Sequence, residues 1–143
     1  MTAAQGPLHI FIVATEESGD RLGAPLMRAI AAKAGRPVKF SGVGGGGMIS
    51  EGLVSQFPIE QLAIVGINEV LAKLPTILRL IRETAAAVVA AKPDMLVIID
   101  SPDFTHRVAS KVRAAMPGLP IVDYVSPTVW AWRPGRARKM RAY

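Results

Sequence analysis

Apolar runs of strand length, separated by segments with helical spacing, constrain the fold of this chain more than any other feature. Leu8–Ala14 and Met95–Ile99 are continuous apolar runs, and residues 121–125 are expected to form another strand. Runs of this kind are typical of strands covered on both faces of a parallel sheet. A shorter run at residues 38–41 predicts a fourth strand. Strands that alternate with helices predict a parallel sheet with right-handed crossovers, and therefore an α/β fold.

The helical segments lie between these strands. Residues 22–34 and 108–116 carry apolar side chains at helical spacing, and each is expected to form a helix. Residues 59–91 also have helical character, and we expect Pro75 to end one helix and to begin a second. Residues 1–143 fit a single Rossmann-like domain with helices on both faces of the sheet.

Composition excludes several kinds of site. The chain has no cysteine, and its two histidines, His9 and His106, are far apart, so we expect no metal and no other cofactor. No stretch reaches the roughly 20 apolar residues that cross a bilayer. The N-terminal apolar run lacks a basic segment before it and ends in glutamates, so we interpret it as a strand and not a signal peptide. A cytoplasmic protein is expected.

Positive charge gathers near the C-terminus. The net charge is +6, and five of the seventeen basic residues occupy the last eleven positions. Phosphate, anionic lipid and nucleic acid are the candidate partners of such a segment. We disfavour nucleic acid, because two tyrosines and two tryptophans offer little stacking surface. The last residues read as the opening turns of a helix, so we expect the N-terminal part of a longer protein.

A glycine run follows the second expected strand. Gly42, Gly44 and Gly47 satisfy the pattern G-x-G-x-x-G, which dinucleotide-binding folds carry after their first strand. Because this run follows the second strand and meets Gly52 soon afterwards, we disfavour a nicotinamide cofactor. Two interpretations stay open. The run is either a flexible turn or a loop whose backbone N–H groups, including that of Gly45, contact a phosphate or sugar.

Two strand ends carry candidate site residues. Ser18, Gly19 and Asp20 stand where the first strand meets its helix, and a helix N-terminus offers N–H donors to anions and hydroxyls. The alternative is that Ser18 or Asp20 only caps the helix. Asp100 ends an apolar strand, where an unpaired carboxylate is costly, so we interpret it as a general base at the ligand-binding edge of the sheet. Asp103 is expected to be the N-cap of the next helix.

An apolar stripe with interleaved cations surrounds Pro75. Its apolar members are Val70, Leu71, Leu74, Ile77 and Leu78, and its cations are Lys73, Arg79 and Arg82. Core packing is the usual explanation of such a stripe. A basic amphipathic helix can instead lie on an anionic membrane. We expect core contacts for some of these side chains and membrane contacts for others.

Tryptophans and cations follow the last expected strand. Trp130 and Trp132 point to opposite sides of an extended chain, one toward the core and one toward a cleft. Arg133 is placed to bind a phosphate with two parallel hydrogen bonds. The alternative for the basic residues beyond it is a solvated helix start.

Read in order, the segments VATEESGD, FSGVGGGGM, IDSPDF and SPTVWAWR resemble the N-terminal half of the lipid-A-disaccharide synthase family, over residues 10–140. The resemblance implies an inverting glycosyltransferase of the two-domain GT-B type. Such an enzyme moves a diacylated glucosamine from its UDP carrier onto a diacylated glucosamine 1-phosphate, forming a β-1,6 disaccharide and UDP. The C-terminal domain, which holds most of the UDP-sugar, is expected to be absent from this chain, which by itself should be inactive.

The resemblance also assigns residues. Its catalytic aspartate matches Asp100, which would accept the proton of the acceptor's 6-hydroxyl. The implied substrate contacts fall in the matching motifs, on Ser18, Gly19, Asp20, Gly44, Gly45, Ser126, Trp132 and Arg133. Because both substrates are lipids, the stripe around Pro75 would dock on the cytoplasmic leaflet of the inner membrane. A homo-oligomer stays open.

Three positions depart from the family's pattern. Thr15 stands where glycine is expected, Gly46 where proline is usual, and Asp123 where histidine is common. Two rival functions are carried forward. One is a nicotinamide-dependent enzyme, and the other is a non-catalytic module that binds phosphate or another anion.

Overall fold

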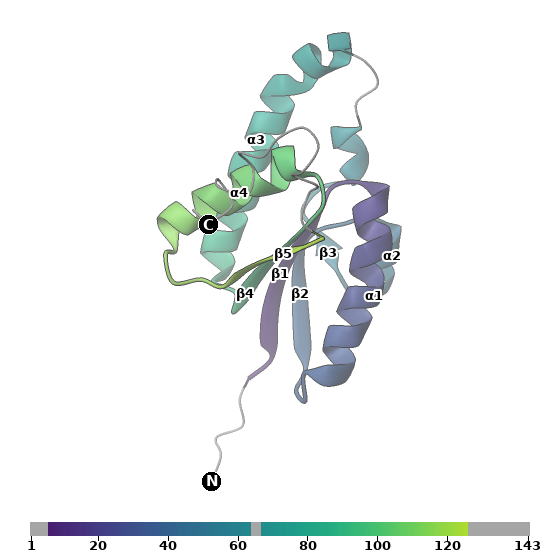
Figure 1. Ribbon diagram of the computed structural model, residues 1–143, viewed down its shortest axis with the longest axis vertical. Coiled ribbons are helices and arrows are strands. Elements are labelled where there is room, and N and C mark those ends of the chain that lie inside the picture. The colour runs from purple at the N-terminus through teal and green to yellow at the C-terminus, as the bar shows by residue number, and fades with distance from the viewer. Residues whose placement is uncertain (1–5, 64–66, 126–143) are drawn as a thin grey trace.

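The computed structural model describes residues 6–63 and 67–125. Its centre is a five-stranded sheet in which all strands are parallel, in the order β3-β2-β1-β4-β5 (Figure 1). The strands are β1 (Leu8–Ala14), β2 (Val38–Val43), β3 (Val54–Ser55), β4 (Met95–Ile99) and β5 (Ile121–Tyr124). The expected parallel α/β sheet is confirmed. The two-residue β3 was not expected, because a strand that short carries no periodicity of its own.

Helices cover both faces of this sheet. They are α1 (Glu17–Lys33), α2 (Gly46–Ser50), the 3-10 turn η1 (Ile59–Leu62), α3 (Ile67–Ala91) and α4 (Pro102–Ala115). In Figure 1, α1 and α2 lie on one side of the sheet, and α3 and α4 lie on the other. This is the Rossmann-like arrangement that the sequence predicts.

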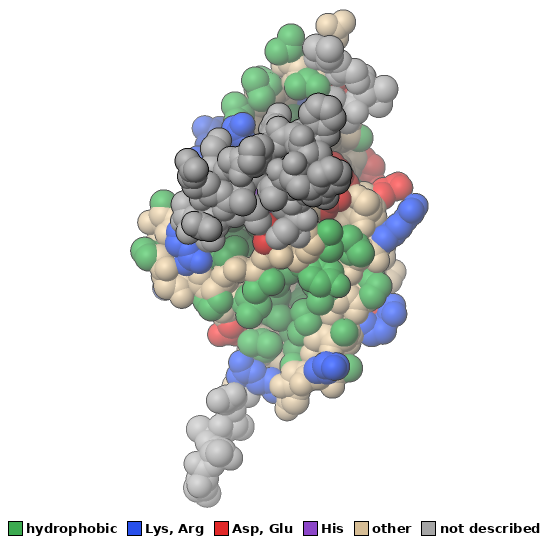
Figure 2. Space-filling model, viewed as in Figure 1, with side chains coloured by type: hydrophobic (Ala, Val, Ile, Leu, Met, Phe, Trp, Pro, Cys, Tyr) green, Lys and Arg blue, Asp and Glu red, His purple; other side chains and the backbone are tan. Residues whose placement is uncertain are grey.

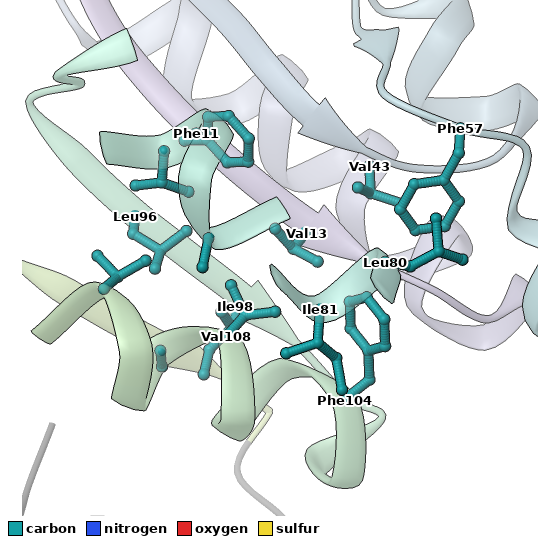
Figure 3. Close-up of a cluster of buried hydrophobic side chains, with 14 of the residues drawn as sticks. Phe11, Val13, Val43, Phe57, Leu80, Ile81, Leu96, Ile98, Phe104 and Val108 are labelled. Atoms are coloured by element: carbon teal, nitrogen blue, oxygen red, sulfur yellow. The ribbon is translucent and has the colours of Figure 1, made fainter. Parts of the chain in front are cut away.

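Alternating side chains of the central strands supply two cores. On the face below α3 and α4, Phe11 and Val13 pack with Ile98 and Val108, and Phe57 meets Phe104 edge to face with 6.2 Å between ring centres (Figure 3). The opposite face buries the other β1 residues, among them Ile12, against α1 and α2. Because β1 is covered on both faces, it contains no polar side chain in its buried half, and this explains its unbroken apolar run.

The expected break at Pro75 is wrong. Helix α3 runs without interruption from Ile67 to Ala91, and α1 likewise contains Pro25. A proline inside a helix leaves the carbonyl four residues earlier without its N–H partner. For Pro75 that carbonyl belongs to Leu71, whose residue is highly exposed, so water can take the vacant bond.

Both helices at the sheet's carboxyl edge begin earlier than expected. Helix α1 begins at Glu17, so Ser18 and Asp20 lie inside its first turn, and no side chain caps it. Helix α4 begins at Pro102 with Ser101 as the N-cap residue. The expectation that Asp103 is the N-cap is therefore wrong, because proline at the first helical position fixes the helix start two residues earlier.

Candidate active site at the carboxyl edge of the sheet

The site lies where the chain changes direction across the sheet. From β1 the chain continues to β2 on one side, whereas β4 pairs with β1 on the other, and Ala14 and Ile99 are the last paired residues. Ligands of open α/β sheets bind outside the strands at such a switch point. A crevice of about 270 Å³ opens there. Its lining residues are Thr15, Glu16, Leu62, Ile77, Ser101, Pro102, Asp103 and Phe104.

Asp100 is the first residue after β4 and directly precedes the part of the chain that lines this crevice. It is partly buried, and the Ser18 hydroxyl donates a hydrogen bond to its Oδ2 at 3.0 Å. Within the described residues its carboxylate forms no ion pair with a lysine or arginine. The carboxylate is thus held in place without being neutralised, as a proton acceptor requires.

The backbone at this point is strained. Asp100 and Ser101 both have left-handed φ angles, 52° and 45°, which residues with a side chain seldom adopt. The Thr105 hydroxyl donates to the Asp100 carbonyl at 2.8 Å, and the amides of Phe104 and Thr105 donate to the Ser101 carbonyl. Strain of this kind persists only where surrounding contacts enforce it, and it is frequent at functional sites.

Ser101 is a candidate site residue that the sequence interpretation missed. Its Oγ is buried yet has no hydrogen-bond partner in the part of the chain that the structure describes, and the residue lines the crevice. A buried hydroxyl without a partner costs free energy unless a ligand or water completes it. The sequence does place a serine directly after Asp100, but it does not tell that the serine is buried, because the burial depends on how α4 packs.

Asp20 holds the glycine run against α1. Its carboxylate accepts the N–H groups of Gly45 at 2.9 Å, Gly47 at 3.0 Å and Met48 at 2.9 Å. These are the unpaired donors at the start of α2, so Asp20 caps that helix and not its own. The expectation that Ser18 or Asp20 caps its own helix is therefore wrong, because the donors that Asp20 binds begin 25 residues further along the chain.

The glycines are explained by close approach to neighbouring side chains. A Cβ atom on Gly45 would lie 2.8 Å from the Asp20 carboxyl carbon, and one on Gly44 would lie 2.7 Å from Leu53 Cδ2. The Gly44 N–H donates to the Ser55 hydroxyl at 3.2 Å. The N–H groups of both residues are therefore engaged inside the protein. Gly19 has a similar role, since its added Cβ would lie 3.1 Å from the Ala14 Cβ.

The structure separates the members of the apolar stripe. Ile77 is partly buried and packs on the core. The other four are exposed, by 41% at Val70, 68% at Leu71, 44% at Leu74 and 43% at Leu78. They belong to the half of α3 that projects beyond the sheet in Figure 1, and Figure 2 shows hydrophobic side chains gathered on that projection.

Other expected site residues have different outcomes. Ser126, Trp132 and Arg133 lie outside the described residues. Thr15 is buried at the crevice, and Asp123 on β5 accepts a hydrogen bond from His106 Nε2 on α4 at 3.1 Å.

Across residues 6–63 and 67–125, no group of three potential metal-binding side chains comes together. The same residues contain no helix with the length and apolar character needed to cross a bilayer.

Together, the switch-point crevice and the fixed carboxylate define a Rossmann-like α/β domain with a candidate ligand site at the carboxyl ends of β1 and β4. Residues 10–143 match the lipid-A-disaccharide synthetase family, and the chain belongs to that family.

Individual relatives agree with this assignment. The lipid-A-disaccharide synthase of Nitrobacter hamburgensis is 66% identical over 142 residues, which cover 99% of this chain and 36% of the relative. That of Rhodopseudomonas palustris strain HaA2 is 66% identical over 94% of this chain and 34% of the relative. The Rhodospirillum centenum enzyme is 49% identical over 96% of this chain. The chain thus spans about a third of the length of these relatives.

Proposed function

We propose that this chain is part of the acceptor-side half of a lipid-A-disaccharide synthase. The whole enzyme would transfer 2,3-diacylglucosamine from its UDP derivative to 2,3-diacylglucosamine 1-phosphate. The products would be a β-1,6-linked disaccharide and UDP. Family membership supports the reaction, and the observation that carries the proposal is the position of Asp100, held by Ser18 beside the crevice at the switch point.

In the proposed mechanism Asp100 is the general base. Its carboxylate accepts the proton of the acceptor's 6-hydroxyl while that oxygen attacks the anomeric carbon of the donor sugar. The new C–O bond forms as the bond to UDP breaks, and UDP leaves with the bonding electron pair. Ser18 keeps the carboxylate directed toward the acceptor. The Ser101 hydroxyl has no partner among residues 6–63 and 67–125, and it is available to a sugar hydroxyl in the crevice. Ser126, Trp132 and Arg133 are proposed substrate contacts from the segment that follows.

A chimera tests this assignment. This chain would replace the matching segment of the Nitrobacter hamburgensis relative, and disaccharide formation would be measured with both lipid substrates. Asp100→Asn should lower kcat by about 10²–10⁴-fold, the usual contribution of a general base. Asp103→Asn is the matched control, since this carboxylate lines the same crevice from the first turn of α4. Equal activity of the Asp100→Asn chimera and its parent would refute the mechanism.

The projecting half of α3 is the proposed membrane contact, on the cytoplasmic face of the inner membrane. Four exposed apolar side chains, at Val70, Leu71, Leu74 and Leu78, support this assignment. Ile77 is left out of the contact because it packs on the core. A surface of this kind inserts its apolar side chains into the boundary between headgroups and acyl chains.

Vesicle co-sedimentation tests the membrane contact. The double variant Leu71→Ser with Leu74→Ser should lose binding to all vesicles. The matched control is Ile49→Ser with Val54→Ser, two exposed apolar residues, 50% and 78% exposed, on other elements of the fold. An equal loss of vesicle binding in the two double variants would contradict a specific role of α3 in membrane binding.

The arrangement of the glycine run does not support the alternative hypothesis of a nicotinamide-dependent enzyme. The glycine run leads into the five-residue helix α2, and its N–H groups bind Asp20 and Ser55. A dinucleotide site instead needs free N–H groups at the start of a helix that follows the first strand. We expect no fluorescence change when NADH is titrated into the protein.

A further inference from the structure

A second concave site lies away from the crevice, between α3 and α4. It is a groove of about 580 Å³. Helix α3 contributes Pro75, Leu78, Ile81 and Arg82, and α4 contributes Arg107, Ser110 and Lys111. The proposed transferase chemistry uses none of these residues.

The groove is strongly cationic. Arg82, Arg107 and Lys111 line it, and no aspartate or glutamate among the described residues does. All three residues are exposed, and within the described residues none of them forms an ion pair or donates a hydrogen bond to another side chain. By contrast, Arg79 on the same helix reaches Glu83 at 3.7 Å. Three unneutralised cations around one concavity create a field that attracts an anion.

The floor of the groove is apolar and continues onto the projecting half of α3. Leu71, Leu74, Leu78 and Arg82 follow one another at intervals of three or four residues, so they lie along one side of the helix. Leu78 belongs both to the exposed apolar surface and to the groove. In Figure 2, Lys and Arg side chains lie directly below the hydrophobic side chains of the projection. A molecule that fits here has an anionic end and an apolar end.

We propose that the groove binds the phosphate headgroup of an anionic phospholipid of the membrane on which α3 docks. Arg82 and Arg107 can each present a planar fork to the phosphate oxygens, and Lys111 adds a third positive charge. The glycerol backbone and the first part of the acyl chains lie over Leu78 and Pro75. This inference rests on the proposed membrane contact, to which it adds a specific site and a specific class of lipid.

Charge-removal variants test the site. Arg82→Gln, Arg107→Gln and Lys111→Gln are combined in one protein. The control combines Arg21→Gln, Lys33→Gln and Lys39→Gln, three exposed cations that do not line the groove, so that both proteins lose the same charge. Binding is measured by co-sedimentation with vesicles of pure phosphatidylcholine and with vesicles containing phosphatidylglycerol. Circular dichroism and thermal melting verify that both proteins fold.

The groove variant should lose affinity for phosphatidylglycerol vesicles by about 100-fold, because each of the three cations contributes roughly fivefold. Its weak binding to phosphatidylcholine should not change. The control variant should lose no more than about threefold. Equal losses in the two variants, or no loss in the groove variant, would overturn the site.

Two further outcomes separate this proposal from others. Tight binding of soluble glycerol phosphate to the wild type, abolished in the groove variant, would assign the groove to a soluble phosphate and overturn the lipid assignment. If the groove variant keeps its preference for phosphatidylglycerol while Leu71→Ser with Leu74→Ser abolishes all vesicle binding, the groove proposal fails and the membrane contact stands.

Discussion

The Ser18 hydroxyl donates to Asp100 Oδ2 at 3.0 Å, a contact between two residues 82 positions apart in the chain. Ser18 lies in the first turn of α1, and Asp100 directly follows β4. The contact exists because β1 and β4 are neighbours in the sheet and end at the same edge. It fixes the orientation of the proposed base, and the first prediction follows from it.

Ser18→Ala should lower kcat of the chimera about tenfold and leave KM unchanged. A hydrogen bond to a charged group contributes about 1.5 kcal/mol, which corresponds to roughly a tenfold change in rate. Because Ser18 is exposed, the free energy of unfolding should change by less than about 0.5 kcal/mol. Ser18→Thr keeps the hydroxyl and should recover most of the activity. An unchanged kcat in Ser18→Ala would show that Ser18 does not position Asp100.

Asp20→Ala should lower the free energy of unfolding by about 3 kcal/mol. Three backbone N–H groups lose a charged acceptor, and water replaces only part of that interaction. Asp20→Asn should be milder, since an amide oxygen still accepts. Urea denaturation measures both. Glu17→Ala, one turn earlier on α1, is the control, because its ion pair with Arg21 is fully on the surface. Similar losses at Glu17 and Asp20 would contradict this account.

Gly46→Pro should raise the free energy of unfolding by about 0.5–1 kcal/mol, because proline restricts the unfolded chain. Gly46 is the first residue of α2, a position that favours proline, and an added Cβ there meets no atom within 4 Å. The preceding Gly45 is extended, as a residue before proline should be.

Gly47→Pro is the matched control for this change. It removes the N–H that donates to Asp20 at 3.0 Å and should therefore destabilise the protein. Thermal melting of both variants measures the difference. If the two prolines shift the melting temperature in the same direction, the capping account of α2 is wrong.

His9 should make stability depend on pH. Burial lowers the pKa of its imidazole below the ordinary value of 6.5, Lys39 adds to the shift, and Asp94 opposes it. The unfolded chain then binds more protons than the folded protein between the two pKa values. The contribution of His9 to the free energy of unfolding is therefore fully present above pH 6.5, and it is lost as the pH falls below that value toward the lowered pKa of the folded protein.

The replacement His9→Gln should flatten this dependence, because glutamine does not titrate but can still bond to the Ser41 hydroxyl, which lies 2.8 Å from His9 Nε2. Urea unfolding at a series of pH values between 5 and 8, for both proteins, measures it. Parallel curves for wild type and His9→Gln would assign the pH dependence to other groups.

The sequence by itself determined the four longer strands, the parallel sheet and the position of Asp100 at a strand end. These features depend on apolar runs and on residues close together in the chain, and β1 and β4 have the bounds that their runs predict. Turn chemistry was less well determined, as the early start of α4 and the uninterrupted helix through Pro75 demonstrate.

Tertiary structure decided which polar groups meet. The pairing of Ser18 with Asp100, the cap that Asp20 provides for α2, and the groove that joins Arg82 to Lys111 all link distant segments. It also decided which stripe residues are core, since Ile77 packs and Leu71 does not. Periodicity tells which side of a helix is apolar, but only the order of the strands and the length of α3 beyond the sheet tell what that side meets.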